Sequence, residues 1–197
     1  MYGNQERKAQ KLYGRRFDMK FITSVQGAPH VTPMQDAMWH KGLWSEDCII
    51  AQDENLKAEL ISNNEIRIRS GIASFQGRFF CIEPGTYDSV TITNGTQAQK
   101  RIDLIVARYE SNEETHTQSM DWKVIQGTPA ASNPQVPAHT SGDLNSDLVA
   151  ELPFCEVHLD GINVTEIVPL MSIQGGIFIS DETIAAFKAI GWTTPSE

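Results

Sequence analysis

The sequence lacks the features of nucleic-acid-binding, membrane and secreted proteins. Its 197 residues include 16 Lys and Arg but 25 Asp and Glu, and the net charge of −9 leaves no broad basic surface for nucleic acid or anionic lipid. No apolar run reaches the roughly 18 residues that a transmembrane helix needs. The first 16 residues are polar and basic, without the apolar core of a secretory signal. We therefore expect a soluble, acidic, globular protein that neither binds nucleic acid nor inserts into a membrane.

Cysteine and histidine are likewise too few and too scattered to predict a metal site. Cys48, Cys81 and Cys155 form no CxxC pair, and the five histidines show neither HxxxH nor HExxH spacing. Isolated cysteines of this kind are typical of buried free thiols in a reducing compartment. The chain also has no GxSxG elbow, no P-loop and no GxGxxG turn. We therefore predict a protein that is not an enzyme, with no catalytic, cofactor-binding or metal-binding residues.

The sequence does contain a long β-strand pattern. From about residue 56 onward, apolar and polar residues alternate with a period of two, as in EIRIR (65–69) and SVTIT (89–93). Residues 101–109 (RIDLIVARY) are apolar on both faces, which predicts a central strand covered on both sides. The pattern predicts a mainly β protein, an antiparallel β-sandwich. Dipeptides with Gly or Pro predict turns at Ser70-Gly71, Gln76-Gly77, Pro84-Gly85 and Asn94-Gly95.

Two features of the β-region stand out within this pattern. Arg101 and Asp103 are two residues apart on one face of the predicted central strand, so we expect them to form a structural ion pair. Residues 127–147 are rich in Pro, Ser, Gly and Asp, and can form neither a helix nor a central strand. We expect this segment to cross an outer surface in extended form.

A short helix is predicted before the β-region, at about residues 33–41. Thr32, Pro33 and Gln35 fit the N-cap, N1 and N3 positions of a capping box, and Gly42 is a natural stop. Met34 and Met38 lie four residues apart and therefore share one side of this helix. We expect them to contribute to a subunit interface.

A second short helix is predicted near the end of the chain, at about residues 181–190. Asp181 lies at its positive N-terminal end, and Ile184, Phe187 and Ile190 form an apolar stripe. So short a helix is marginal in water unless its stripe packs against something. Two alternatives are open: the helix packs on its own sandwich, or it packs on another subunit. The second alternative makes these three residues candidates for a subunit interface.

The composition divides the chain into three parts. Residues 1–18 are rich in Lys and Arg, although the chain as a whole is acidic. They form either a basic arm or an extension upstream of Met19. Residues 19–171 hold the predicted sandwich, and residues 172–197 are a C-terminal helical appendage.

Several runs of this sequence resemble structural proteins of tailed-phage baseplates. The pattern is similar to the N-terminal shoulder domain of siphophage receptor-binding and upper baseplate proteins, and it covers about residues 21–171. The runs that carry the resemblance are GAPHVTPMQDAMWHKGLW (27–44), NNEIRIRSGIASFQGRFFCIEPGTYDSVTI (63–92), NGTQAQKRIDLIVARYE (94–110), VIQGTPA…NPQVPA (124–138) and FCEVHLDGINVTEIVPLM (154–171).

This resemblance implies a function in the virion tail, for a protein synthesised in the bacterial cytoplasm. Shoulder domains are β-sandwiches that anchor to the tail hub, commonly as trimers, while a separate C-terminal head binds host saccharide. Only 26 residues follow Met171, too few for a lectin-like head, which favours a role as an adaptor. The expected partners are further copies of the chain in a homotrimer and other baseplate proteins. A module that binds host cell-surface saccharide is the alternative, and an unrecognised hydrolase is the second alternative.

Overall fold

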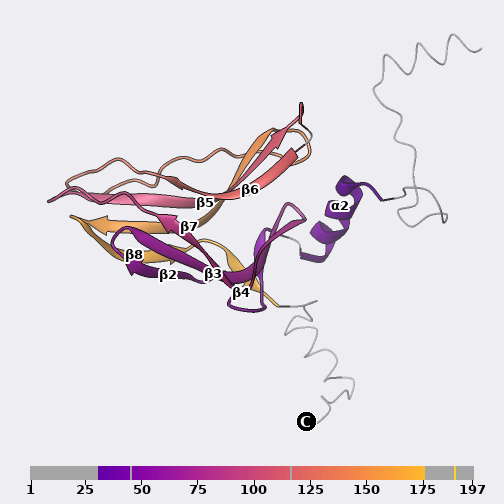
Figure 1. Cartoon of the computed structure of the whole chain (residues 1–197), viewed down its shortest axis with the longest axis horizontal. Coiled ribbons are helices and arrows are strands. Elements are labelled where there is room, and N and C mark those ends of the chain that lie inside the picture. The colour runs from indigo at the N-terminus through magenta and orange to yellow at the C-terminus, as the bar shows by residue number, and fades with distance from the viewer. Residues whose placement is uncertain (1–30, 45, 116, 176–188, 190–197) are drawn as a thin grey trace, which may run out of the picture. The chain divides into compact units, whose positions relative to one another are not determined.

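The computed structural model describes residues 31–44, 46–115, 117–175 and residue 189 (Figure 1). The chain comprises two compact units, residues 1–35 and residues 36–197. Both sheets described below belong to the second unit. The predicted helix at 181–190 lies outside the described residues, apart from Ala189, and the predicted N-terminal arm lies wholly outside them.

The first sheet is built around one long central strand. This strand, β3, pairs antiparallel with β4 along one side and with β1 and β2 along the other, and β9 adds to β1 in parallel. β9 extends the sheet three residues beyond 171, where the sequence had suggested an appendage. The strands are β1 (Cys48–Ile50), β2 (Ala58–Ser62), β3 (Glu65–Phe75), β4 (Arg78–Thr91) and β9 (Ser172–Gln174).

The second sheet is entirely antiparallel, with the strand order β6-β5-β7-β8. Its strands are β5 (Lys100–Asn112), β6 (Thr117–Ile125), β7 (Val149–Asp160) and β8 (Asn163–Pro169). Buried apolar side chains from both sheets form one continuous core. The predicted antiparallel β-sandwich is therefore confirmed.

β5 occupies the interior position that its apolar pattern predicted. Residues 101–107 of this strand are all buried, on both of its faces. Ile105 and Ala107 join the core between the sheets, while Leu104 and Val106 alternate with them and are buried on the opposite face. Residues 127–147 run beside this sheet as an extended segment, as predicted (Figure 1). The backbones of Thr140 and Glu151 are joined where the segment passes β7.

Two of the predicted turns are absorbed into strands. The chain does not reverse at Ser70-Gly71, because β3 continues through both residues. Pro84-Gly85 does not end β4 either. Instead the register between the strands shifts: Gly71 pairs with Ile82, but Arg69 pairs with Tyr87, so residues 83–86 bulge out of the ladder. Pro84-Gly85 has the residues of a turn, but the pairing register of β4 with β3 makes it a bulge and not a reversal of the chain.

Asn94-Gly95 does not form the predicted hairpin. The strand before it, β4, ends at Thr91 in the first sheet, and the strand after it, β5, begins at Lys100 in the second. A Cβ atom at Gly95 would lie only 1.9 Å from the carbonyl oxygen of Gly161. Glycine is needed here for close backbone packing as the chain crosses between the sheets.

The predicted N-terminal helix is present as α2 (Pro33–Trp44). Its capping box forms as expected: the Gln35 amide donates to Thr32 Oγ1 at 3.2 Å, and the Thr32 amide donates to Gln35 Oε1 at 2.9 Å. The predicted stop at Gly42 was wrong, because the helix continues through it to Trp44. Gly42 does not adopt the left-handed backbone conformation of a glycine helix stop, so it does not end the helix.

Candidate interaction surfaces

Arg101 and Asp103 are brought together inside the sandwich. The guanidinium donates to both carboxylate oxygens, from Nε at 2.8 Å and from Nη2 at 2.9 Å. The two side chains are only 3% and 0% exposed, respectively. A bidentate pair in this setting has fixed geometry and no access to solvent. The predicted pair therefore forms near the start of β5, and the structure shows that it is buried.

This buried pair also fixes two loops. The remaining donors of Arg101 reach the backbone carbonyls of Thr93 and Asn94, in the crossover between the two sheets. The Gly127 amide donates to Asp103 Oδ1 at 2.9 Å, where the extended segment begins. The ion pair is therefore a structural node that fixes the crossover and the segment to β5, and its donors are already engaged.

A second network surrounds Glu151, which sequence analysis did not single out. Arg108 Nη1 and Lys123 Nζ donate to its Oε1 at 2.6 and 2.9 Å, and the Thr140 amide donates to its Oε2 at 2.6 Å. Burial alone would raise the pKa of Glu151, but the hydrogen bonds from Lys123, Thr140 and Arg108 outweigh it and lower the pKa to about 2. These partners come from β5, β6 and the extended segment, so no local sequence signal reveals the network.

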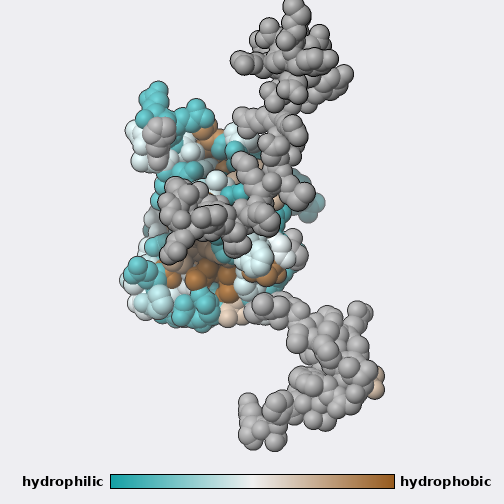
Figure 2. All heavy atoms as spheres, turned by 90° about the vertical axis from the view of Figure 1, so that its right-hand side faces the viewer, coloured by the Kyte–Doolittle hydropathy of each residue, from teal (hydrophilic) through white to brown (hydrophobic). Residues whose placement is uncertain are grey.

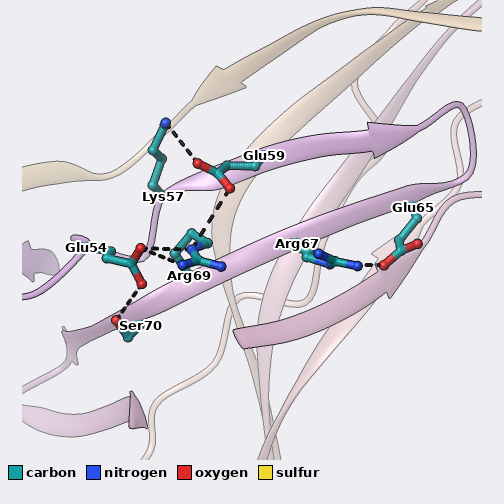
Figure 3. Close-up of polar contacts among 7 residues, drawn as sticks. All are labelled: Glu54, Lys57, Glu59, Glu65, Arg67, Arg69 and Ser70. Carbon is teal, nitrogen blue, oxygen red and sulfur yellow. Dashed lines mark hydrogen bonds and ion pairs between the residues drawn. The ribbon is translucent and has the colours of Figure 1, made fainter. Parts of the chain in front are cut away.

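The first sheet carries an exposed charged cluster on and beside β2 and β3 (Figure 3). Arg69 donates from Nε and Nη2 to Glu54 Oε1, at 2.9 and 2.7 Å, and Ser70 Oγ donates to the other carboxylate oxygen. Lys57 Nζ lies 2.9 Å from Glu59 Oε1. The hydrogen bond from Arg69 lowers the pKa of Glu54 and raises that of the arginine. Ser70 is buried, whereas the charged side chains of this cluster touch solvent and are accessible from outside.

An exposed tyrosine lies beside this cluster. The guanidinium carbon of Arg67 lies 4.5 Å from the centre of the Tyr87 ring, and that of Arg69 lies 5.9 Å away. Glu65 accepts hydrogen bonds from Arg67 and from Ser89. Tyr87 is 46% exposed, so an aromatic ring is presented next to paired charges.

The helix α2 presents apolar side chains to solvent. Met38 is 63% exposed and Trp39 61%, and Leu43 is exposed on the same side as Trp39. Only Ala37 is buried, where the turn at Gly77 packs so closely that a Cβ would meet the Ala37 carbonyl oxygen. We call Met38, Trp39, Leu43 and the exposed Phe79 of β4 the α2 patch. Figure 2 views the right-hand side of Figure 1 and shows apolar surface between polar regions on that face.

An apolar groove of about 350 Å³ opens between the two sheets. It lies between the β1–β9 edge of the first sheet and strands β7 and β8 of the second. Its floor includes Leu56 and Phe154, both buried, and its rim includes the exposed Ile173. The other apolar residues that line it are Ile49, Ala58, Cys155, Ile167, Pro169 and Met171.

Of the residues predicted to form a subunit interface, the structure describes only Met34 and Met38. Met34 and Met38 are exposed, at 54% and 63%, so α2 leaves both of them uncovered. Ile184, Phe187 and Ile190 lie outside the described residues. The apolar side chains of α2 also extend further around the helix than the expected stripe, because Trp39 and Leu43 lie opposite Ala37.

No family model and no curated protein matches this chain. Among the described residues, no helix has the length and apolar character to span a membrane. Within the same part of the chain, no three His, Cys, Asp or Glu side chains gather where they could hold a metal ion. Cys48, Cys81 and Cys155 are free thiols, as predicted, and Cys48 and Cys155 are buried. The expected burial was wrong for Cys81, which lies on the exposed face of β4.

Proposed function

We propose that this chain is a non-enzymatic structural module of a tailed-phage baseplate, which adapts the host-recognition apparatus to the tail. The proposal rests on the structural role of residues in the runs that resemble baseplate proteins. Gly95 permits the close crossover between sheets, and Arg101, Asp103 and Gly127 form the buried node. These residues build a framework for the sandwich, as expected for a family pattern that specifies a shoulder fold rather than a chemistry.

The α2 patch supports assembly as the mode of action. The helix α2 carries large apolar side chains on more than one side, yet it buries only Ala37 against its own sandwich. Aromatic residues and methionine are enriched in the centres of protein interfaces, and this patch combines Met38, Trp39 and Phe79. In a three-fold assembly, α2 of each copy would lie beside α2 of the other two around the symmetry axis, where the α2 patch would be covered. We therefore propose a homotrimer held by α2.

Imaging of the phage particle that encodes this chain tests the location directly. The proposal predicts density for the sandwich in the baseplate, in three-fold copies, by cryo-electron microscopy. Anti-chain antibodies should label the tail tip of intact particles. Particles assembled without the chain should lack a complete baseplate. Normal tails in its absence, with no labelling, would refute the proposal.

One observation favours the saccharide-binding alternative. Tyr87 is exposed beside Arg67 and Glu65, and sugars bind to such rings by stacking while charged groups accept or donate to their hydroxyls. Glycan arrays with the purified chain test this reading. Binding that Tyr87→Ala abolishes and that Trp39→Ala preserves would establish it, and the absence of any glycan signal would reject it.

A further inference from the structure

The apolar groove lacks the features of a small-molecule site. Its two charged lining residues are already paired, Glu54 with Arg69 and Lys57 with Glu59. A small ligand usually needs a few polar groups that are free to fix its orientation. Of the lining residues that the structure describes, Asn55 is the one other polar residue, and the remaining ones are apolar and continuous with the core at Leu56 and Phe154. Such a surface fits an apolar side-chain stripe better than a polar ligand.

The described chain leads directly out of this groove. Ile173 of β9 forms part of its rim and is 55% exposed, and the last described residue of that run is Gly175. Beyond it, the sequence holds the short apolar run 177–179 and then the stripe Ile184, Phe187 and Ile190, and only the second has the spacing of an amphipathic helix that can lie along a groove. Five residues, 176–180, join Gly175 to the predicted helix, and a linker of that length reaches about 17 Å. The stripe can therefore fold back onto the rim from which it starts.

We propose that residues 181–190 fill the apolar groove of their own chain, with Phe187 as the main anchor. A short linker gives the segment a millimolar effective concentration at its own groove, well above that of a neighbour at micromolar protein. One polar group in the groove fits this occupant. Asn55 lines it, and its Oδ1 is buried without a hydrogen-bond donor among the described residues, so it can accept from a backbone N–H or hydroxyl of the segment.

This inference is independent of the baseplate assignment. It gives the predicted C-terminal helix and α2 different roles. The sandwich supplies a groove for the C-terminal stripe, whereas α2 leaves its own apolar side chains on the surface. The C-terminal residues then stabilise the fold, and the subunit contact falls to α2 alone.

The test compares Phe187→Asp with Ala185→Asp in the full chain. Ala185 lies on the opposite side of the predicted helix, so it introduces the same charge without entering the groove. We expect Phe187→Asp to lower the melting temperature by about 5 °C or more and to speed proteolysis after Lys188 about tenfold, whereas Ala185→Asp changes neither. Ile173→Asp, on the exposed rim, should reproduce the effect, and the double variant should add little further. Equal behaviour of the two aspartate variants would overturn the proposal.

A mixing experiment separates the chain's own groove from that of a neighbour. Phe187→Asp chains have an intact groove, and Ile173→Asp chains have an intact stripe. If the segment binds its own groove, co-refolding the two variants restores no protection. If it binds a neighbour's groove, mixed oligomers regain a matched pair and part of the protease resistance, which would contradict docking within one chain. Both outcomes are independent of whether the chain is found in a baseplate.

Discussion

Two of the arginine–carboxylate pairs in this sandwich lie in different surroundings. The Arg101–Asp103 pair is almost fully buried, and it also holds two loops. In the Arg69–Glu54 pair both guanidinium donors reach the same carboxylate oxygen, and the two side chains are 29% and 40% exposed. Water can replace the partners of the exposed pair, whereas no solvent can replace those of the buried one. The comparison indicates that the buried charges maintain the fold and that the exposed charges contribute little to its stability.

The largest expected effect is the loss of one buried partner. Asp103→Ala leaves the Arg101 guanidinium buried and unpaired, and it removes the acceptor of the Gly127 amide. We expect a loss of about 3–5 kcal/mol in the free energy of unfolding, measured by urea denaturation. The double variant Arg101→Met/Asp103→Leu should be less destabilised than the single one, because no charge is left buried. A single variant as stable as the wild type would contradict the structural role of the node.

Lowering the pH should remove the stabilisation that Glu151 contributes to the fold. Its pKa is about 2 in the folded chain and near 4.5 when it is unperturbed, so the folded state binds this proton less readily than the unfolded state. The stabilisation is therefore complete above about pH 5 and is lost as the pH falls toward 2. We expect about 1–3 kcal/mol from this group, since one pKa unit corresponds to about 1.4 kcal/mol. Glu151→Gln should be less stable at pH 7 and should lose less stability between pH 5 and 3. If the stabilities of the two proteins fell in parallel between pH 5 and 3, Glu151 would not contribute the expected stabilisation.

Close backbone packing should make Gly127 intolerant of a side chain. A Cβ atom there would lie 2.0 Å from the Ile102 carbonyl oxygen. We expect Gly127→Ala to cost about 1–3 kcal/mol through forced backbone shifts. Gly42→Ala is the control, because it lies in the exposed interior of α2 with open space around it; it should stabilise the helix slightly. Equal effects of the two substitutions would mean that packing at Gly127 is looser than the structure indicates.

The smallest effect is expected at the exposed charges. Glu54→Gln should leave the urea midpoint near that of the wild type, because Arg69 can turn to water and to Glu59, whose Oε2 lies 3.9 Å from its Nε. High salt should likewise change little. A loss of stability as large as that of Asp103→Ala would remove the distinction between the two clusters.

The sequence predicted those features that depend on neighbours along the chain. Alternation identified the strands, the apolar run identified β5 as an interior strand, and Thr32 with Gln35 identified the start of α2. The Arg101–Asp103 pair was also visible, because its members are two residues apart on one strand.

Features that depend on register between distant segments were not predicted. Glu151 meets Arg108 only because β5 and β7 pair in one particular register, with 43 residues between them in the sequence. Pro84-Gly85 has the chemistry of a turn, but the pairing of β4 with β3 determines that it forms a bulge. Asn94-Gly95 is similar, since the next strand joins the opposite sheet. In each case local chemistry limits the backbone, and non-local pairing decides the outcome.

The central claim, assembly through α2 of a sandwich held by buried charges, is tested most directly by the mass of the chain in solution. Multi-angle light scattering at micromolar concentration should give about three times the 21.9 kDa of one chain. Trp39→Asp should shift the mass toward one chain, whereas Leu60→Asp, which replaces an exposed residue of β2 outside the α2 patch, should not. A single species of one-chain mass for the wild type at every concentration would contradict the account.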